Sequence, residues 1–373
     1  MTEEKYTEEE LTVDTATAET PEAENVELSD SVSESAAVAV KKKGNFFSRG
    51  INYAAKNFDS WKAWIYLLPA LILLLIFTVW PIINTVRIAF LEGYRSVEVA
   101  NENFYLKYPN GYEVGLGNFT RVLEFKGFAT CLKNTLLLCV ITVPLSTILA
   151  LLIAVCLNAI KPLQRFLQTV FFLPYVTNSI AIGMVFTAMF NVAGTLTSEN
   201  PVIQTAGIMN NILEAFGFEA VNWINAGSSY WANMTVLIVY IVWNALPFKI
   251  LILLGGLQSV NKQYYEAAQI DSTPRWRVFT RITVPLLSPM LAYVIITGFI
   301  GGFKEYSSII GIFGDKMGPV GDAYRLNTMV GFIYRYLPDS REGLVSAAAL
   351  ILFLIIFAVT MVNLYVSKKK THY

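Results

Sequence analysis

The residue types that carry most enzyme chemistry are scarce in this 373-residue chain. Its one histidine is His372, the next-to-last residue, and its three cysteines, Cys131, Cys139 and Cys156, have no paired spacing. A disulfide framework, a zinc site and histidine-based catalysis are therefore excluded. The sequence also has no phosphate-cradling GxxxxGK[ST] loop, so it is not expected to hydrolyse ATP itself. What remains is a set of polar residues inside apolar segments, together with one polar loop.

The polar loop, residues 258–282, reads QSVNKQYYEAAQIDSTPRWRVFTRI. Its pattern predicts two short helices at an angle. Residues 261–270 are good helix formers, and the run 271–274 then breaks the first helix. Thr273 is expected to be the N-cap of the second helix and Pro274 its first residue, where the missing N–H of proline has no cost.

The second helix combines aromatic and cationic side chains. Trp276 and Phe279 are three residues apart and so lie on one face, with arginines around them at Arg275, Arg277 and Arg281. The two short helices are therefore expected to form a compact knob that projects into the cytoplasm.

This loop resembles the EAA loop of binding-protein-dependent ABC importer permeases of the maltose (carbohydrate) type. It carries Glu266-Ala267-Ala268, then Asp271, then Ile282-Thr283-x-Pro285. Flanking segments fit the same family: Pro247-Phe248, Gly256-Leu257-Gln258-Ser259, Pro285-Leu286-Leu287-x-Pro289 and Phe172-Leu173-Pro174-Tyr175. The resemblance covers roughly residues 60–370.

The resemblance implies that the loop docks in a cleft of a cytoplasmic ATPase and transmits its closure to the membrane helices. The residues to which it gives this coupling role are Glu266, Ala267, Ala268, Asp271, Ser272, Trp276 and Phe279. One position departs from the family, which usually has glycine after the aspartate. A glycine would allow a left-handed turn at little cost. Ser272 is expected to turn by another route, with a slightly different angle between the helices.

Six apolar segments are long enough to cross a bilayer, which needs about 20 residues each. They are roughly 64–91, 134–157, 167–193, 229–257, 283–303 and 345–366. Together with the resemblance, they predict an all-α integral membrane protein with the six-helix fold of type I ABC importer permeases. Prolines recur inside these segments, which membrane helices tolerate where neighbouring helices or a cavity satisfy the freed backbone groups.

Charge sets the orientation and the domain boundaries. With the N-terminus inside, the inner segments hold 15 Lys and Arg in 64 residues and the outer loops nine in 117, so both termini are expected to be cytoplasmic. Residues 1–44 read as a disordered acidic tail. Residues 45–63 read as a basic amphipathic segment at the membrane surface. The permease domain is expected over 64–366 and a basic cytoplasmic C-terminus over 367–373.

A solute path is expected where polar and aromatic residues interrupt the spans. Matching to the family gives the path residues Tyr175, Asn178, Asn244, Ala245, Phe248, Gly298, Gly301, Gly302 and Glu305. The two asparagines could equally form packing hydrogen bonds, and the glycines could serve close helix packing. Lys249 is expected to snorkel or to pair with a carboxylate. Glycine at 301 and 302 lacks the side chains of the maltose permease, which disfavours maltose itself.

The resemblance implies a transport subunit of the bacterial cell membrane that is no enzyme and binds no cofactor. ATP and Mg would be bound by a partner ATPase dimer. Further implied partners are a second permease subunit, an extracytoplasmic solute-binding protein and the lipid bilayer, and no nucleic acid is expected. The cargo is expected to be a carbohydrate, with glycerol phosphate or another polar organic solute as the alternative. A stand-alone secondary transporter is a remote alternative, because it would want an intramembrane carboxylate or histidine relay.

Overall fold

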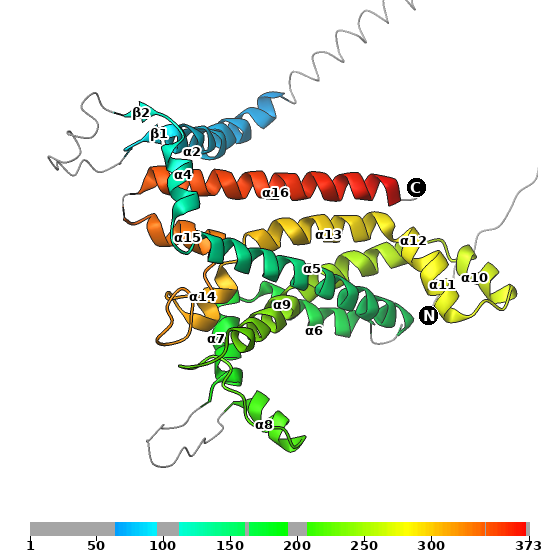
Figure 1. Cartoon of the computed structure of the whole chain (residues 1–373). Coiled ribbons are helices and arrows are strands. Elements are labelled where there is room, and N and C mark those ends of the chain that lie inside the picture. Colours follow the sequence, from blue (N-terminus) through cyan, green and yellow to red (C-terminus); the bar gives the residue numbers. More distant parts are fainter. Residues whose placement is uncertain (1–63, 95–111, 161–163, 193–206, 340, 371–373) are drawn as a thin grey trace, which may run out of the picture. The chain divides into compact units, whose positions relative to one another are not determined.

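The computed structural model describes residues 64–94, 112–160, 164–192, 207–339 and 341–370 (Figure 1). The predicted tail 1–44 and the surface segment 45–63 lie outside the described residues. The chain divides into two compact units, residues 1–80 and 81–373, which are described separately.

The described part of the first unit is helical. It belongs to a continuous helix, Trp64–Phe90, of 27 residues. Within this helix the π-helical turn η1 (Leu75–Val79) is followed by α2 (Trp80–Phe90). The large apolar side chains from Trp64 to Phe77 are exposed. A helix that is apolar all round is typical of a membrane span.

The second unit is built from long apolar helices. These are α5 (Phe128–Ala159), α9 (Tyr230–Ser259), α13 (Ser288–Phe303) and α16 (Glu342–Lys370). By length and composition, four described helices of the whole chain can cross a membrane, or five if the bent pair Arg275–Leu286 and Ser288–Gly302 forms one span. These five correspond to five of the six predicted segments.

The predicted span 167–193 is instead two shorter helices, α6 (Gln164–Val176) and α7 (Ser179–Phe190). The break is fixed by Asn178, whose Oδ1 accepts a hydrogen bond of 2.9 Å from the backbone N–H of Ile180 and so caps α7. Each helix is shorter than the roughly 20 residues that a straight span needs.

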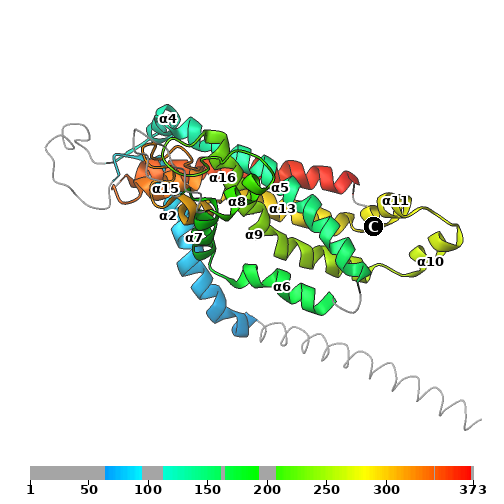
Figure 2. The same cartoon turned by 90° about the horizontal axis from the view of Figure 1, so that it is seen from below.

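Short elements gather at the two ends of the long helices in the second unit. At one end lie α4 (Gly117–Glu124), α8 (Ile208–Ala215), α14 (Ser307–Phe313), α15 (Met329–Tyr336) and a small antiparallel sheet, in which β1 (Leu91–Glu92) pairs with β2 (Glu113–Val114). At the other end α10 (Gln263–Ile270) and α11 (Arg275–Val278) project beyond the long helices, in both views (Figures 1 and 2). The C-terminal end of α16 lies at this second end.

The core of this unit centres on the packing of α5 against α9. Both helices contain an internal proline, Pro144 in α5 and Pro247 in α9. Buried side chains of both helices form a shared cluster that includes Ala150, Leu253 and Leu254. Two further clusters join α5 and α9 to α7 and α14, and α5 to α15 and α16.

Lys249 of α9 is buried against α5, close to Pro144. Its Nζ donates to Ser146 Oγ at 2.6 Å, to Thr147 Oγ1 at 3.0 Å and to the carbonyl oxygen of Val143 at 3.2 Å. The prediction that this lysine snorkels or pairs with a carboxylate is therefore wrong. An ammonium has three donors, and here hydroxyl and carbonyl oxygens satisfy all of them inside the bundle.

Glycines set the closest helix contacts. A Cβ added at Gly183 of α7 would lie 2.6 Å from Gly311 Cα of α14, so the two backbones touch. Added Cβ atoms at Gly298 and Gly302 of α13 would lie 3.1 Å from Val143 Cγ1 and 3.0 Å from Cys139 Sγ of α5. Small residues let membrane helices approach closely and gain dispersion energy.

Gly183→Ala is expected to lower the stability of the chain by about 1–3 kcal/mol, because the new methyl group would overlap backbone atoms that cannot move without separating α7 from α14. Gly255→Ala is the matched control, since a Cβ there meets nothing within 4 Å. Thermal unfolding of the purified protein should show a lower midpoint for the first variant alone. Equal midpoints would contradict the assigned contact.

Candidate functional site

The first helix of the polar loop 258–282, α10, ends in a Schellman motif. The N–H of Thr273 donates to the carbonyl of Ala268 at 2.9 Å, and the N–H of Ser272 donates to that of Gln269 at 3.0 Å. This motif requires a left-handed residue directly after the C-cap, a place usually taken by glycine. Ser272 takes it, with φ of 51°. The expectation that serine would turn by another route is therefore wrong: it adopts the conformation that glycine would.

The second helix begins one residue later than predicted. Pro274 is extended, with ψ of 143°, and is itself the N-cap of α11, which starts at Arg275. Thr273 is therefore not the cap. The predicted aromatic pair is confirmed, because the ring centres of Trp276 and Phe279 lie 5.7 Å apart.

Interactions inside the loop hold the two helices together. The hydroxyl of Tyr265 on α10 lies 3.3 Å from that of buried Thr283 in the π-helical turn η2 (Phe279–Thr283). Ala268 of α10 is buried, with 7% of its surface exposed. Glu266 and Ala267 are exposed on the same helix. Of the three residues of the EAA segment, Ala268 is thus buried, whereas Glu266 and Ala267 are accessible.

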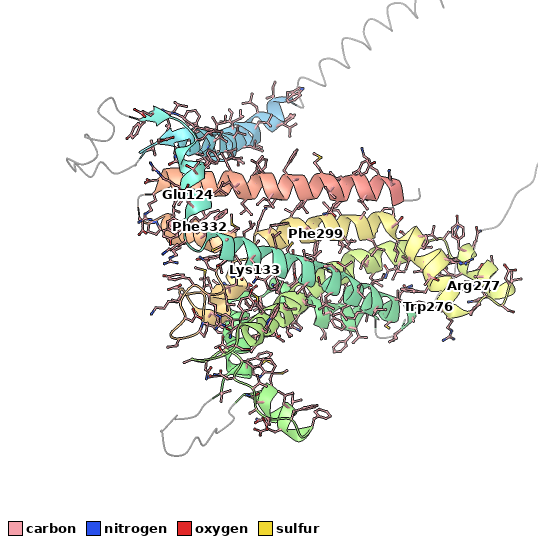
Figure 3. The ribbon with its side chains drawn as sticks, viewed as in Figure 1. Glu124, Lys133, Trp276, Arg277, Phe299 and Phe332 are labelled. Atoms are coloured by element: carbon pink, nitrogen blue, oxygen red, sulfur yellow. The ribbon has the colours of Figure 1, made fainter. Side chains whose placement is uncertain are left out.

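The exposed surface of the knob is aromatic, aliphatic and cationic. Ile270 is 85% exposed, Trp276 72% and Tyr264 54%. Arg277 lies beside Trp276 at the projecting end (Figure 3). Aromatic residues and arginine are enriched at protein–protein interfaces. Ile270 and Tyr264 were not among the predicted coupling residues, although an isoleucine at the end of a short polar helix is a signal that the sequence offers.

The knob is joined to the bundle by a sharp bend. Helix α12 (Val284–Leu286) follows η2, and the axis then turns by 67° into α13. Prolines at positions 285 and 289 flank the bend at Leu287. Because proline lacks an N–H and its ring displaces the preceding turn, these residues fix the place of the bend.

Four predicted path residues share one face of α6 and α9. The rings of Tyr175 and Phe248 stack with their centres 5.8 Å apart and an angle of 18° between them. Asn244 and Ala245 are half-buried, one turn before Phe248 on α9. The structure thus brings an aromatic pair and an amide together at a partly exposed face.

The other predicted path residues have structural contacts. Asn178 caps α7, and Gly298 and Gly302 pack on α5. Glu305 accepts a hydrogen bond from Ser308 N–H at 3.2 Å through Oε1, at the start of α14. Gly301 faces open space. Their role in a solute path stays a prediction.

Sequence comparison places these features in a family. Residues 143–372 match the family described as "Binding-protein-dependent transport system inner membrane component", which is more than half of the chain. This chain belongs to that family. It is therefore a membrane-embedded permease component of a transport system, and the reading as a stand-alone secondary transporter is set aside.

Relatives of this permease cover most of its length. The lactose transport system permease protein LacF of Rhizobium radiobacter is 26% identical over 83% of this chain and 93% of its own. The arabinooligosaccharides transport system permease protein AraP of Halalkalibacterium halodurans is 32% identical over 68% of this chain and 75% of its own. A solved bacterial alginate ABC transporter in complex with an alginate pentasaccharide-bound periplasmic protein has the same fold, with a TM-score of 0.64 at 21% identity, covering 84% of this chain and 97% of that one.

Ser272→Gly is expected to stabilise the coupling loop by about 0.5–1 kcal/mol, because glycine adopts a left-handed conformation without the Cβ penalty. Hydrogen–deuterium exchange of residues 260–287 measures this as slower exchange. Ser272→Ala is the control, since it keeps the Cβ and should bring no gain. If both variants exchanged alike, the left-handed turn at this position would be refuted.

Proposed function

We propose that this permease is one half of the translocation path of an ATP-driven importer for a carbohydrate delivered by an extracytoplasmic binding protein. The observation that carries the proposal is the projecting knob of α10 and α11, with exposed Ile270 and Trp276, joined to a membrane helix through the 67° bend. An apolar, cationic surface of this kind needs a protein partner. The names of the lactose and arabinooligosaccharide permeases support a sugar or oligosaccharide as the cargo.

The partner at the knob would be a cytoplasmic ABC ATPase dimer, which binds ATP and Mg. The permease chain itself would bind no cofactor. Closure of the ATPase would move the knob, and the proline-flanked bend at Leu287 would pass this movement to α13. Glu266, exposed on α10, would contact the ATPase together with Trp276, whereas buried Ala268 would keep the knob compact.

A second permease subunit would complete the path. Tyr175 is 51% exposed on α6 and stacks on half-buried Phe248 of α9, and Trp243 of α9 is 37% exposed. Stacked rings suit the C–H faces of sugars, and the amide of Asn244 suits their hydroxyls. We assign the sugar-contacting face of this subunit to these residues.

The orientation that fits the proposal puts the knob and both termini in the bacterial cytoplasm. The C-terminal end of α16, whose last three residues are lysines, lies at the end of the bundle that carries the knob (Figure 1). Excess Lys and Arg on this side agrees with the positive-inside rule. The opposite end, with α8, α14 and α15, would then face the binding protein.

Reconstitution tests the function directly. Gentle extraction of the tagged chain from its native cells should recover an ATPase and a second permease, and the complex in proteoliposomes should take up a saccharide only with ATP and the binding protein. A chain that purifies alone and moves solute without ATP would overturn the proposal.

Glu266→Lys is expected to lower ATP-driven uptake at least about tenfold, the factor that corresponds to about 1.4 kcal/mol, while the subunits still co-purify. The reversed charge would face the ATPase cleft and disturb docking without unfolding the loop, since Glu266 is exposed. Glu266→Gln should have a smaller effect, because it removes the charge without reversing it. Unimpaired uptake by Glu266→Lys in an intact complex would exclude the coupling role.

A further inference from the structure

A cleft of about 390 Å³ opens at the end of the bundle opposite the knob. It lies between the α4–α5 turn, the first turns of α5 and α9, the segment 314–328 and α15. Its lining includes the cations Lys126, Arg325 and Arg335, the tyrosines Tyr230 and Tyr324, and the carboxylate Asp322. This size is in the range of small-molecule sites.

Aromatic rings hold the arginines of the cleft in place. The guanidinium carbon of Arg335 lies 3.3 Å from the ring centre of Tyr324 and 5.0 Å from that of Tyr336. The guanidinium carbon of Arg325 lies 5.8 Å from the ring centre of Tyr230. Stacking occupies the face of a guanidinium and leaves its N–H edges for a planar anion such as a carboxylate.

Charge in the cleft is not balanced. Asp322 is the one carboxylate among the described lining residues, and its Oδ2 lies 3.2 Å from Nη1 of Arg325. Within the described chain, no carboxylate lies at ion-pair distance from Lys126 or Arg335. Cations are disfavoured on the outer side of a membrane protein, so two unpaired ones at the same cleft favour an anionic ligand.

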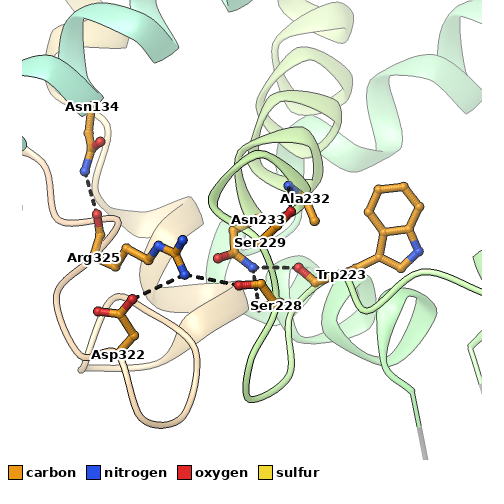
Figure 4. A network of polar contacts seen from close by, with 8 residues as sticks. All are labelled: Asn134, Trp223, Ser228, Ser229, Ala232, Asn233, Asp322 and Arg325. Atoms are coloured by element: carbon orange, nitrogen blue, oxygen red, sulfur yellow. Dashed lines mark hydrogen bonds and ion pairs between the residues drawn. The ribbon is translucent and has the colours of Figure 1, made fainter.

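Hydrogen bonds fix the walls of the cleft before any ligand arrives (Figure 4). Asn134 of α5 donates from Nδ2 to the carbonyls of Arg325 and Asn327 at 3.0 and 2.9 Å, and its Oδ1 accepts from the Tyr230 hydroxyl at 2.8 Å. Nη1 of Arg325 donates to the carbonyl of Ser228 at 3.1 Å. Preorganised walls lower the entropic cost of binding.

The segment 314–328 also holds two residues in a conformation that L-residues rarely adopt. Met317 has φ of 44° and Tyr324 φ of 67°. The N–H of Tyr324 donates to the carbonyl of Lys316 at 2.7 Å, and its ring lies against Arg335. Backbone strain of this kind gathers at ligand sites, where the surrounding contacts maintain it.

We propose that this cleft binds the carboxylate or phosphate of an anionic saccharide at the outer end of the permease. Arg335 and Lys126 bind the anionic group, and the tyrosine rings stack on the C–H faces of the sugar. The proposal rests on the proposed function and narrows its substrate class. Few cations lie within the predicted spans themselves. The structure places the cations at the end of the bundle, where residues far apart in the sequence meet.

Direct binding to the whole transporter complex in phosphatidylcholine nanodiscs, without the binding protein, tests the cleft. The probe is trigalacturonate, with its neutral methyl ester as the matched control and glucose 6-phosphate as the phosphate probe. Calorimetry should show trigalacturonate or glucose 6-phosphate binding at least about tenfold more tightly than the neutral ester. The affinity should fall with added salt. Equal binding of the acid and its ester, or binding of neither anion, would overturn the proposal.

Variants locate the site. Arg335→Gln and Lys126→Gln should each weaken anion binding about tenfold. Lys126 is exposed without a structural contact among the described residues, so its variant tests the cleft even if Arg335→Gln disturbs the segment 314–328. Lys304→Gln removes an exposed cation that does not line the cleft and should change nothing. Full affinity in both cleft variants would refute the site.

Two further measurements show whether the anion comes from a lipid or a saccharide, and test the cleft independently of the proposed function. If phosphatidylglycerol in the nanodisc competes with trigalacturonate in the parent protein but not in Lys126→Gln, the cleft is a lipid headgroup site and the saccharide assignment is wrong. ATP-driven uptake of a neutral saccharide without anion binding would refute the cleft alone. Anion binding without any ATP-driven uptake would refute the proposed function and leave the cleft standing.

Discussion

The contact between α5 and α9 determines the architecture of the second unit. Each helix contains an internal proline, which lacks an N–H and so leaves the carbonyl four residues before it without its usual donor. Lys249 crosses from α9 to α5, where it donates to the carbonyl of Val143 and the hydroxyls of Ser146 and Thr147. A buried ammonium would be costly if any donor were unpaired, so this interaction fixes how far the two helices can slide past each other.

In the loop 258–282, by contrast, rigidity comes from local backbone geometry and not from contacts between long helices. The Schellman motif at Ser272 and the contact of Tyr265 with Thr283 fix the angle between the two short helices. The apolar side chains that are left over, Ile270 and Trp276, point outward. Such a loop can move as one body, which is what the proposed function would require of the segment between two membrane helices.

Sequence reasoning located the loop, its aromatic pair and five of the spans, because proline, charge and apolar length are local signals. It did not foresee the break at Asn178, where a single side-chain cap outweighs an apolar run that looks continuous. It misjudged Lys249 because the partners of this residue lie about 100 positions away along the chain. The outer cleft was missed for the same reason: Lys126, Tyr230 and Arg335 come from three segments that only the fold brings together.

Both ends of α13 are tied to other elements. One end meets the bend at Leu287, and directly after the other end the carbonyl of Glu305 accepts a hydrogen bond of 2.8 Å from Thr328 Oγ1, beside the wall of the cleft. A helix fixed in this way behaves as a stiff rod between two sides of a membrane. Coupling between two binding sites is reciprocal. Under the proposed function, a rod that carries nucleotide-driven motion to the cleft would also transmit the effect of ligand binding there back to the loop, so that ligand affinity at one end and nucleotide affinity at the other would be linked.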